Sequence, residues 1–432
     1  MTRCLSAWPW LAALLLCLAF GSAPSGALAA GQNGVCLHCH GAQPNLAPEE
    51  LRLDRDAANT HASLKCQACH AGKDAVPHKS QPRTACLSCH VRHGESVAHD
   101  VHERVTCEAC HLGGDGKAVL KDGAVVFVAG GEGALKLHDM KPGSDGASCA
   151  RCHFAGNEAG APAAALPPKG VLCAACHAAT ATAEDLPTKA GLFVFLAGFA
   201  LLACSWIFGM NLGKGEALAM PEANHGPREP LGRRLWSFFL DAFLQRRLWR
   251  EDREAWGIHA MIFFPFVFRS LWGLAALAGS LACPAAEWPW LMLARDWAPS
   301  ALLFDLSGLV LLAGLALAWR RWQQIDAAGG PVKRRDRPAL VLIFATTLAG
   351  FLLEGMRIAI AHAPEGSSWA FAGRFLSCFI GSGSIVQSAY GFVWYLHACL
   401  TAATACYIPF SQLRHMFTAP ASLLADCLGR RR

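Results

Sequence analysis

The chain has 432 residues, of which 53% are hydrophobic and 16% are charged, whereas roughly a quarter of the residues in an ordinary soluble domain are charged. It also carries 20 Cys and 18 His, which excludes an ordinary cytosolic globular enzyme. The net charge of +6 requires no nucleic-acid partner, because the surplus Lys and Arg gather between long apolar stretches. This composition predicts a mainly α-helical membrane protein with a loop-rich part that binds metal or haem.

The N-terminus has the pattern of a secretory signal. Arg3 precedes an apolar run over residues 8–20, and residues 27–29 (ALA) supply a small-residue cleavage site. We therefore expect residues 1–29 to be removed and the segment after them to be exported. An uncleaved membrane anchor is the alternative, and it exports the same segment.

Residues 30–188 contain the pattern Cys-x-x-Cys-His six times, far more often than chance predicts. Two thiols at this spacing bond to the two vinyl groups of one haem, and the adjacent His reaches the iron. Disulfides and zinc knuckles are the alternatives, but zinc ribbons do not require a His after every Cys pair. We therefore expect a multihaem cytochrome c domain with six covalently bound c-type haems. The residues are Cys36, Cys39, His40, Cys66, Cys69, His70, Cys86, Cys89, His90, Cys107, Cys110, His111, Cys149, Cys152, His153, Cys173, Cys176 and His177.

The other histidines of this domain are expected to supply the second axial ligands. Apart from His38, which lies inside the first motif, they are His61, His78, His93, His99, His102 and His138. Six candidates for six irons favour bis-histidine coordination, which is typical of a low-potential electron carrier rather than of an open catalytic iron. The sequence leaves open which His serves which iron, and Met140 competes with His138.

One regular element is expected in this domain. Asp122-Gly123 lies between two arms of alternating apolar residues, which predicts a β-hairpin over residues 117–128. The hairpin comes between the fourth and fifth motifs. It therefore suggests a group of four haems followed by a looser group of two.

Residues 189–425 are expected to form a five-helix transmembrane bundle, because each apolar segment reaches the roughly 20 residues that cross a bilayer. The segments are 190–210, 258–282, 301–319, 338–361 and 388–410. Lys and Arg concentrate in alternate loops, which is the positive-inside pattern. It places the haem domain in the periplasm, the C-terminus in the cytoplasm and the protein in a bacterial inner membrane. Residues 231–250 are expected to form an amphipathic helix on the inner surface.

Four histidines lie near these spans, where ionisable residues are costly and usually functional. They are His259, His362, His397 and His415. The last two are 18 residues apart, or roughly 27 Å of straight helix, which would put them on one face at different depths. Pro409 lies between them and makes this argument approximate.

Four segments resemble the nitrate reductase gamma-subunit family, particularly its relatives in sulfate-reducer membrane complexes and heterodisulfide reductases. They are GIHAMIFFPFVFR (257–269), LFDLSGLVLLAGLALAWRRW (303–322), LAGFLLEGMRI (348–358) and WYLHACLTAATACYIPFSQLRHMFTAP (394–420), and the similarity spans residues 190–425. The resemblance implies a cytochrome b with one or two b-type haems. His259 and His415 would hold the haem nearer the cytoplasm, and His397 would serve the outer one.

The chain departs from this family at one position. The most familiar members of the family have a second His ten residues after the first, but here that residue is Arg269. The outer haem therefore lacks its expected partner. Three alternatives stay open: it uses His362, it is ligated differently, or it is absent.

Charged residues in the spans are expected to cluster, because Arg269 in mid-span needs a partner. Asp305, Glu354 and Arg357 are the candidates. Such a cluster could neutralise haem propionates or line a quinone pocket in which Glu354 accepts a proton. A structural ion pair is the alternative for Glu354. The sequence also leaves undecided whether Cys283 and Cys378, both on the oxidising side, form a disulfide.

Together the two halves predict a membrane-bound electron-transfer cytochrome that passes electrons between periplasmic c-type haems and haem b or the quinone pool, with menaquinone as a candidate. The expected partners are membrane lipid, quinone and a periplasmic cytochrome or hydrogenase, and no nucleic acid. One alternative is a subunit that conducts electrons to a cytoplasmic iron–sulfur partner of the heterodisulfide reductase type, without quinone chemistry of its own. A haem-based redox sensor is disfavoured because no output domain follows the fifth span. The sequence does not decide whether the chain is part of a quinol:cytochrome c oxidoreductase.

Overall fold

The computed structural model describes Gln67, His70, Cys86, His102 and residues 105–112, 116–128, 147–207, 230–283, 286–328 and 336–428. The chain divides into two compact units. One unit consists of Met1–Ser88, His111–Asp115 and Ala129–Pro142, and few of its residues are described. The other consists of Cys89–Cys110, Gly116–Val128 and Gly143–Arg432 and contains the elements discussed below.

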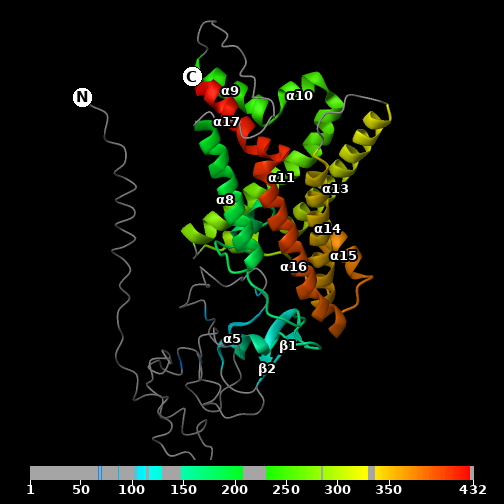
Figure 1. Ribbon diagram of the computed structural model, residues 1–432. Coiled ribbons are helices and arrows are strands. Elements are labelled where there is room, and N and C mark those ends of the chain that lie inside the picture. Colours follow the sequence, from blue (N-terminus) through cyan, green and yellow to red (C-terminus); the bar gives the residue numbers. More distant parts are fainter. Residues whose placement is uncertain are drawn as a thin grey trace, which may run out of the picture. The chain divides into compact units, whose positions relative to one another are not determined.

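The described part of the chain is mainly helical, and five of its helices are long and apolar enough to cross a membrane (Figure 1). They are α8 (Leu186–Ile207), α11 (Arg253–Ala282), α13 (Ala298–Ala327), α14 (Arg337–Ile360) and α16 (Ser384–Tyr407). The 22 residues of α8 extend about 33 Å, enough for a hydrocarbon core of roughly 30 Å. The sequence expectation of five helices long and apolar enough to cross a membrane is therefore confirmed.

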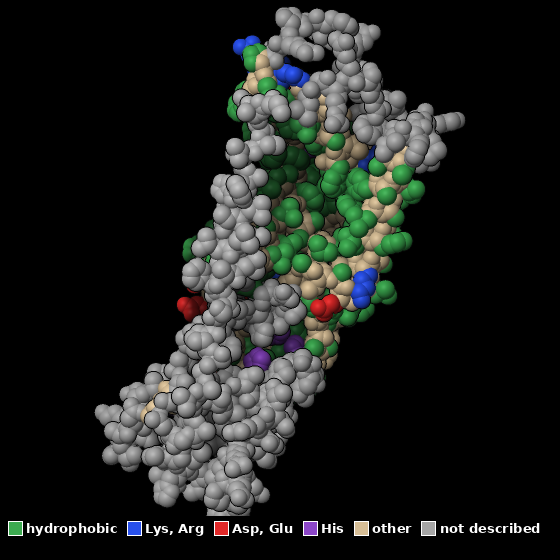
Figure 2. Space-filling model, turned by 90° about the vertical axis from the view of Figure 1, so that its left-hand side faces the viewer, with side chains coloured by type: hydrophobic (Ala, Val, Ile, Leu, Met, Phe, Trp, Pro, Cys, Tyr) green, Lys and Arg blue, Asp and Glu red, His purple; other side chains and the backbone are tan. Residues whose placement is uncertain are grey.

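Each of the five helices packs against at least one other: α13 contacts α11 and α14, α14 also contacts α16, and α16 contacts α8. Between α14 and α16 lies a buried cluster of Leu353, Met356, Ile360 and Tyr390. The outward sides of the helices are also apolar, and Ile385 on α16 is 83% exposed. Figure 2 shows hydrophobic side chains along the helices in view, with charged side chains nearer their ends. Such surfaces are suited to lipid rather than water.

Short elements connect the long helices or lie beside their ends. They are α9 (Leu231–Ala242), α10 (Arg246–Glu251), α12 (Trp288–Leu293), η3 (Ser367–Trp369), α15 (Phe371–Ser377), η4 (Ile408–Phe410), η5 (Gln412–Arg414) and α17 (His415–Leu428). The amphipathic helix expected at 231–250 is confirmed in part, because Gln245, in the left-handed region (φ 54°), separates α9 from α10.

Helix α16 does not continue to His415. It ends at Tyr407, and the chain turns through η4 and η5 before α17 begins at His415. Pro409 in η4 explains the break, since its ring cannot continue a helix without a clash. The interruption considered at Pro409 is therefore present, and the same-face argument for His397 and His415, which requires a straight helix, does not apply.

The β-hairpin expected at 117–128 is confirmed. Strands β1 (Lys117–Lys121) and β2 (Ala124–Val128) pair antiparallel. Asp122 and Gly123 both have positive φ (51° and 78°), as a two-residue type I′ turn requires. The hairpin packs on the fifth motif, with Ala118 and Val125 buried against Ala159 and half-buried Cys152.

Residues 156–178 pack on one end of the bundle, which we call the motif end. Gln387 of α16, only 3% exposed, accepts a hydrogen bond from Gly156 N (2.7 Å) and donates one to the Asn157 carbonyl (3.2 Å). Its own carbonyl accepts from Ala163 N (3.0 Å). The segment between the fifth and sixth motifs is therefore part of the same packed body as the helices.

Asp336 fixes the opposite end of the bundle and offers a test of the packing there. Its carboxylate accepts from Ala339 N (3.4 Å) at the start of α14, from the Tyr407 hydroxyl (2.7 Å) and from Gln412 N (2.8 Å). We expect Asp336→Ala to destabilise the protein by about 1–3 kcal/mol, because a helix cap and two cross-links are lost. The measurement is thermal unfolding of the purified protein in detergent.

Asp326→Ala is the matched control for Asp336→Ala. Asp326 makes an exposed ion pair with Arg337 (2.7 Å), and exposed pairs contribute only about 0–1 kcal/mol. Equal losses of stability in the two variants would contradict the role given to Asp336.

Candidate functional site

The fifth and sixth Cys-x-x-Cys-His motifs are described completely and share one local fold. The fifth starts in α7 (Ala147–Ala150) and the sixth in η2 (Val171–Ala175). In both, the amides of the second Cys and of the His donate to the carbonyl of the first Cys: 3.1 and 3.0 Å to Cys149, and 2.9 and 3.1 Å to Cys173. A single turn thus brings two thiols and one imidazole together. The fourth motif forms α5 (Cys107–His111).

The four thiols of these two motifs are free. None of their four Cys forms a disulfide. Burial raises the pKa of Cys152 and of Cys173 to about 11, and for Cys173 this outweighs the opposite effect of nearby Lys169. Burial also holds the pKa of His177 well below its usual value. Its imidazole is therefore neutral at neutral pH, which is the form that binds iron.

Three pairs of histidine rings lie close together in the described unit. The ring centroids are 6.3 Å apart for His102 and His153, 6.4 Å for His177 and His397, and 6.0 Å for His259 and His415. With metal–nitrogen bonds of about 2 Å and about 1 Å from nitrogen to ring centre, two imidazoles on one iron have centres roughly 6 Å apart. All three pairs have the spacing of bis-histidine coordination.

The second ring nitrogen of most of these histidines is oriented by a hydrogen bond, as in metal-binding histidines generally. Because a carbonyl oxygen only accepts, the Nδ1 atoms donate and Nε2 keeps its lone pair. The contacts are His153 to Pro162 O (2.9 Å), His177 to Ala178 O (3.2 Å), His415 to Gln412 O (2.7 Å) and His259 to Gln245 Oε1 (2.9 Å).

His397 differs from the other histidines in its surroundings. Its Nδ1 is buried without a hydrogen bond of normal geometry, although the Thr346 backbone of α14 lies close enough to interact with the imidazole. The ring lies over Gly350 of α14, where an added Cβ would be 3.4 Å from His397 Cε1. The ring is therefore held by packing against α14 and faces the sixth motif, since its described ring neighbour is His177.

The sixth motif is seated on α11 by close backbone contact. The Ser270 hydroxyl donates to the Ala175 carbonyl (2.6 Å). A Cβ at Gly273 would overlap the Ala174 carbonyl oxygen and would lie 2.8 Å from that of His177. Only glycine permits this approach, so Gly273 sets the distance between the motif and the helix.

Arg269 lies one turn before Gly273 and does not join an acidic cluster. Its side chain donates to Ser307 Oγ (2.9 Å) and to the Phe304 carbonyl, and lies over the Phe304 ring at 5.1 Å. Its hydrogen-bond partners thus all lie on α13. Arg269 therefore makes no ion pair with Asp305 or Glu354, and polar groups of α13 satisfy its guanidinium instead. The expected charge cluster is present in part, since Glu354 pairs with Arg357.

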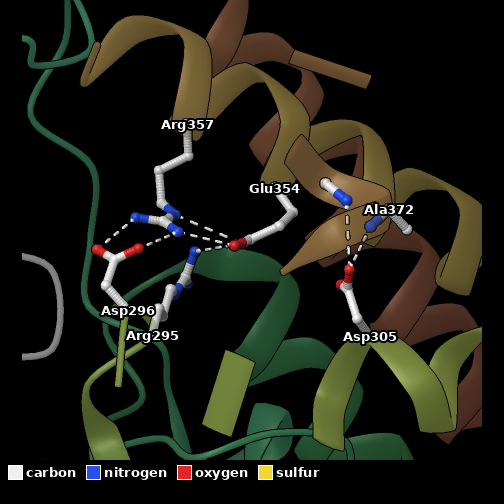
Figure 3. Close-up of polar contacts among 7 residues, drawn as sticks. Arg295, Asp296, Asp305, Glu354, Arg357 and Ala372 are labelled. Atoms are coloured by element: carbon white, nitrogen blue, oxygen red, sulfur yellow. Dashed lines mark hydrogen bonds and ion pairs between the residues drawn. The ribbon is translucent and has the colours of Figure 1, made fainter. Parts of the chain in front are cut away.

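The other charged residues form two separate arrangements near the motif end (Figure 3). Arg357 lies between Asp296 (3.0 and 2.9 Å) and Glu354 (2.7 Å), and Arg295 is 4.0 Å from Glu354. Asp305 instead accepts from the first amides of α15, Ala372 N (2.6 Å) and Gly373 N (3.4 Å). Glu354 thus makes the ion pair expected for a structural role, and its proton-accepting role stays a prediction.

For three further residues the structure settles what the sequence left open, and other predicted residues are not described. His397 pairs with His177 and not with His362, which is exposed beyond the end of α14. Cys283 and Cys378 are both free and form no disulfide. Other predicted features lie outside the described residues: the signal segment, Cys36, Cys39, His40, Cys66, Cys69, Cys89, His90, His61, His78, His93, His99 and His138.

The sequence interpretation missed two polar residues that position these groups. Gln245 bonds His259, and Gln387 anchors residues 156–163 to α16. Gln387 could have been found, since an amide in an apolar span requires buried partners. Gln245 carried no such signal because it lies in a polar stretch. Among the described residues, no group of three or more His, Cys, Asp or Glu could bind a metal ion.

No protein-family model matches the chain, and no solved structure matches it. The chain is 27% identical over 242 residues to the EtfAB:quinone oxidoreductase of Syntrophomonas wolfei. This match covers 52% of the chain and 31% of the relative, so the chain spans about a third of that protein's length. Apart from this likeness, five helices of the described part are long and apolar enough to cross a membrane.

Substitution of two glycines on α11 tests how the sixth motif is seated. We expect Gly273→Ala to lower the thermal unfolding temperature, because the methyl group would overlap the Ala174 carbonyl and overpacking costs about 1–3 kcal/mol. We expect Gly257→Ala to leave the temperature unchanged or raise it slightly, since nothing lies within 4 Å there and Ala is favoured over Gly in helices by about 0.5–1 kcal/mol. Shifts of the same sign and size would contradict the close contact.

Proposed function

We propose that the chain is a membrane-bound electron-transfer cytochrome, which passes electrons between c-type haems outside the inner membrane and a b-type haem and the quinone pool. The observation that carries the proposal is that imidazole pairs lie at both ends of one apolar bundle, and that one pair includes the His of a Cys-x-x-Cys-His motif. Haem iron held in this way supplies one-electron transfer.

The c-type haems would be held by the six motifs. For the fifth, Cys149 and Cys152 supply the thioether bonds, while His153 and His102 lie at the spacing of two axial ligands. Arg151 supports this site by donating to the Ala109 carbonyl (3.2 Å) and lying over the Phe127 ring (5.0 Å). These contacts connect the fifth motif to α5 and to the hairpin, and they help to fix the distance between the His102 and His153 rings.

A b-type haem would be held at the opposite end by His259 and His415. The two residues come from the start of α11 and the start of α17, and Gln245 and the Gln412 carbonyl orient their rings. His259 lies 14 residues before Gly273 on α11, about 21 Å along the helix axis. The two imidazole pairs of the bundle therefore lie at different depths, with a separation below the thickness of the hydrocarbon core.

We further propose that the motif end faces the periplasm and that a quinone is the membrane-soluble partner. The Arg-rich segments at the opposite end favour the cytoplasm by the positive-inside rule, which puts the motif end at the periplasm. The curated relative is named as a quinone oxidoreductase, and this supports a quinone as the membrane-soluble partner. Glu354, in the motif end of α14, is proposed as the acceptor of the quinol proton. Partners on the periplasmic side would be a cytochrome or a hydrogenase.

The second candidate is a conduit that exchanges electrons with a cytoplasmic iron–sulfur protein and has no quinone chemistry. The name of the relative places EtfAB beside quinone, which supports a second partner besides quinone. In this function the His259–His415 pair would lie next to the partner, and Glu354 would have only its structural ion pair.

Reduction by a menaquinol analogue separates the two functions. We expect the purified protein to show rapid reduction of both b-type and c-type absorbance bands without any partner. His415→Ala should lose the b-type signal and the rapid c-type reduction, while dithionite still reduces every c-type haem. His362→Asn is the control, since His362 is exposed and Asn tolerates its left-handed backbone (φ 53°). No reduction by quinol, with reduction by a co-purifying iron–sulfur protein, would establish the conduit instead.

Substitution of Glu354 tests the proton step separately. We expect Glu354→Gln to slow quinol-dependent reduction by about 100-fold, as removal of a general base does, and Glu354→Asp to recover part of the rate. Dithionite reduction and haem content should not change. Glu365→Gln, in an exposed loop position, is the matched control. An unchanged quinol rate in Glu354→Gln would leave Glu354 with a structural role alone.

A further inference from the structure

We infer that His397 of α16 is the second axial ligand of the haem attached to Cys173 and Cys176, whose first ligand is His177. The outer haem of the bundle would then be the sixth c-type haem and not a b-type haem. This inference rests on the proposed haem content of the chain and assigns a ligand that the sequence left open.

The geometry of the two rings is the first argument. Their centroids are 6.4 Å apart and their planes are inclined by 18°. Van der Waals contact between two flat rings face to face would bring them closer, whereas one iron bonded to a nitrogen of each ring gives roughly 6 Å. Both rings are half-buried, and the buried Nδ1 of His397 has no hydrogen bond of normal geometry.

The attachment of the sixth motif is the second argument. A covalently bound haem can reach a ligand on another element only if its two thiols are held at a fixed distance from that ligand. Here η2 contacts α8, α11 and α16, and the contacts at Ser270 and Gly273 bring its backbone onto α11. Gly191 of α8 adds a third close approach, since a Cβ there would lie 2.8 Å from Leu172 and 3.0 Å from Ala402.

The place of Arg269 is the third argument. A b-type haem at this level would need a second imidazole from the bundle, and α11 supplies an arginine whose donors bind α13. His362, the other candidate, is exposed and has no ring contact with His397. Among the described residues, the imidazole beside His397 is the one that follows Cys173 and Cys176 directly in sequence.

Ligation by His397 would also connect two parts of the chain. A haem bonded to the exported segment and ligated by a membrane helix would fix the two parts of the chain to each other. The fifth and sixth motifs would then differ in kind: His102 supplies the second ligand of the fifth from the same segment, and α16 supplies that of the sixth.

The test compares the wild-type protein with His397→Ala and His397→Met. In His397→Ala we expect one in six c-type haems to become five-coordinate and high-spin in the electron paramagnetic resonance spectrum of the oxidised protein, and to bind added imidazole. The number of covalent haems by intact mass and the b-type absorbance should stay unchanged. In His397→Met the same haem should remain six-coordinate with a raised midpoint potential, because thioether ligation raises the potential. This second variant keeps the test valid if the alanine variant folds poorly.

The outcomes separate this inference from the proposed function. Loss of b-type absorbance in His397→Ala would show that His397 holds a non-covalent haem and would overturn the inference. Six low-spin c-type haems in His397→Ala would overturn it as well, while leaving the electron-transfer function intact. Absence of covalent haem from the wild-type protein would overturn both the assignment of His397 and the proposed function. His415→Ala is the control, in which b-type absorbance falls and no c-type haem becomes high-spin.

Discussion

Two imidazoles share one iron only when the protein holds their centres about 6 Å apart, and the described unit meets this distance three times. The rings cannot set the distance themselves, so the elements that carry them must. At the motif end, Gly273 lets the sixth motif approach α11 until His177 lies opposite His397. At the opposite end, the turn after Tyr407 brings His415 beside His259.

The buried charged residues of the bundle also help to fix the positions of the helices that carry the histidines. An unpaired ion in an apolar span would be costly, and each one here is compensated locally. Arg357 joins the start of α13, through Asp296, to Glu354 on its own helix, and Asp305 receives the free amides at the start of α15. These contacts fix α13, α14 and α15 to one another beside His397. These contacts therefore restrain the motif end around the ring that we propose as a haem ligand.

Much of the architecture could be predicted from the sequence because it depends on local patterns. The five spans follow from the length of apolar runs, and the hairpin follows from Asp122-Gly123, whose residues both adopt positive φ. The pairing of histidines could not be predicted in this way. His177 and His397 are 220 residues apart, and their meeting depends on a glycine contact and on the path of residues 156–178. The same holds for Arg269, whose partners are polar groups on another helix rather than carboxylates.

The central claim is that one chain carries porphyrins of two kinds, attached outside the membrane and inserted within it. The pyridine haemochrome spectrum of the purified protein tests this most directly, because it counts c-type and b-type haems in one sample. The account predicts a ratio of six to one, from six Cys-x-x-Cys-His motifs and the His259–His415 pair. A spectrum without c-type haem, or one without b-type haem, would contradict the account.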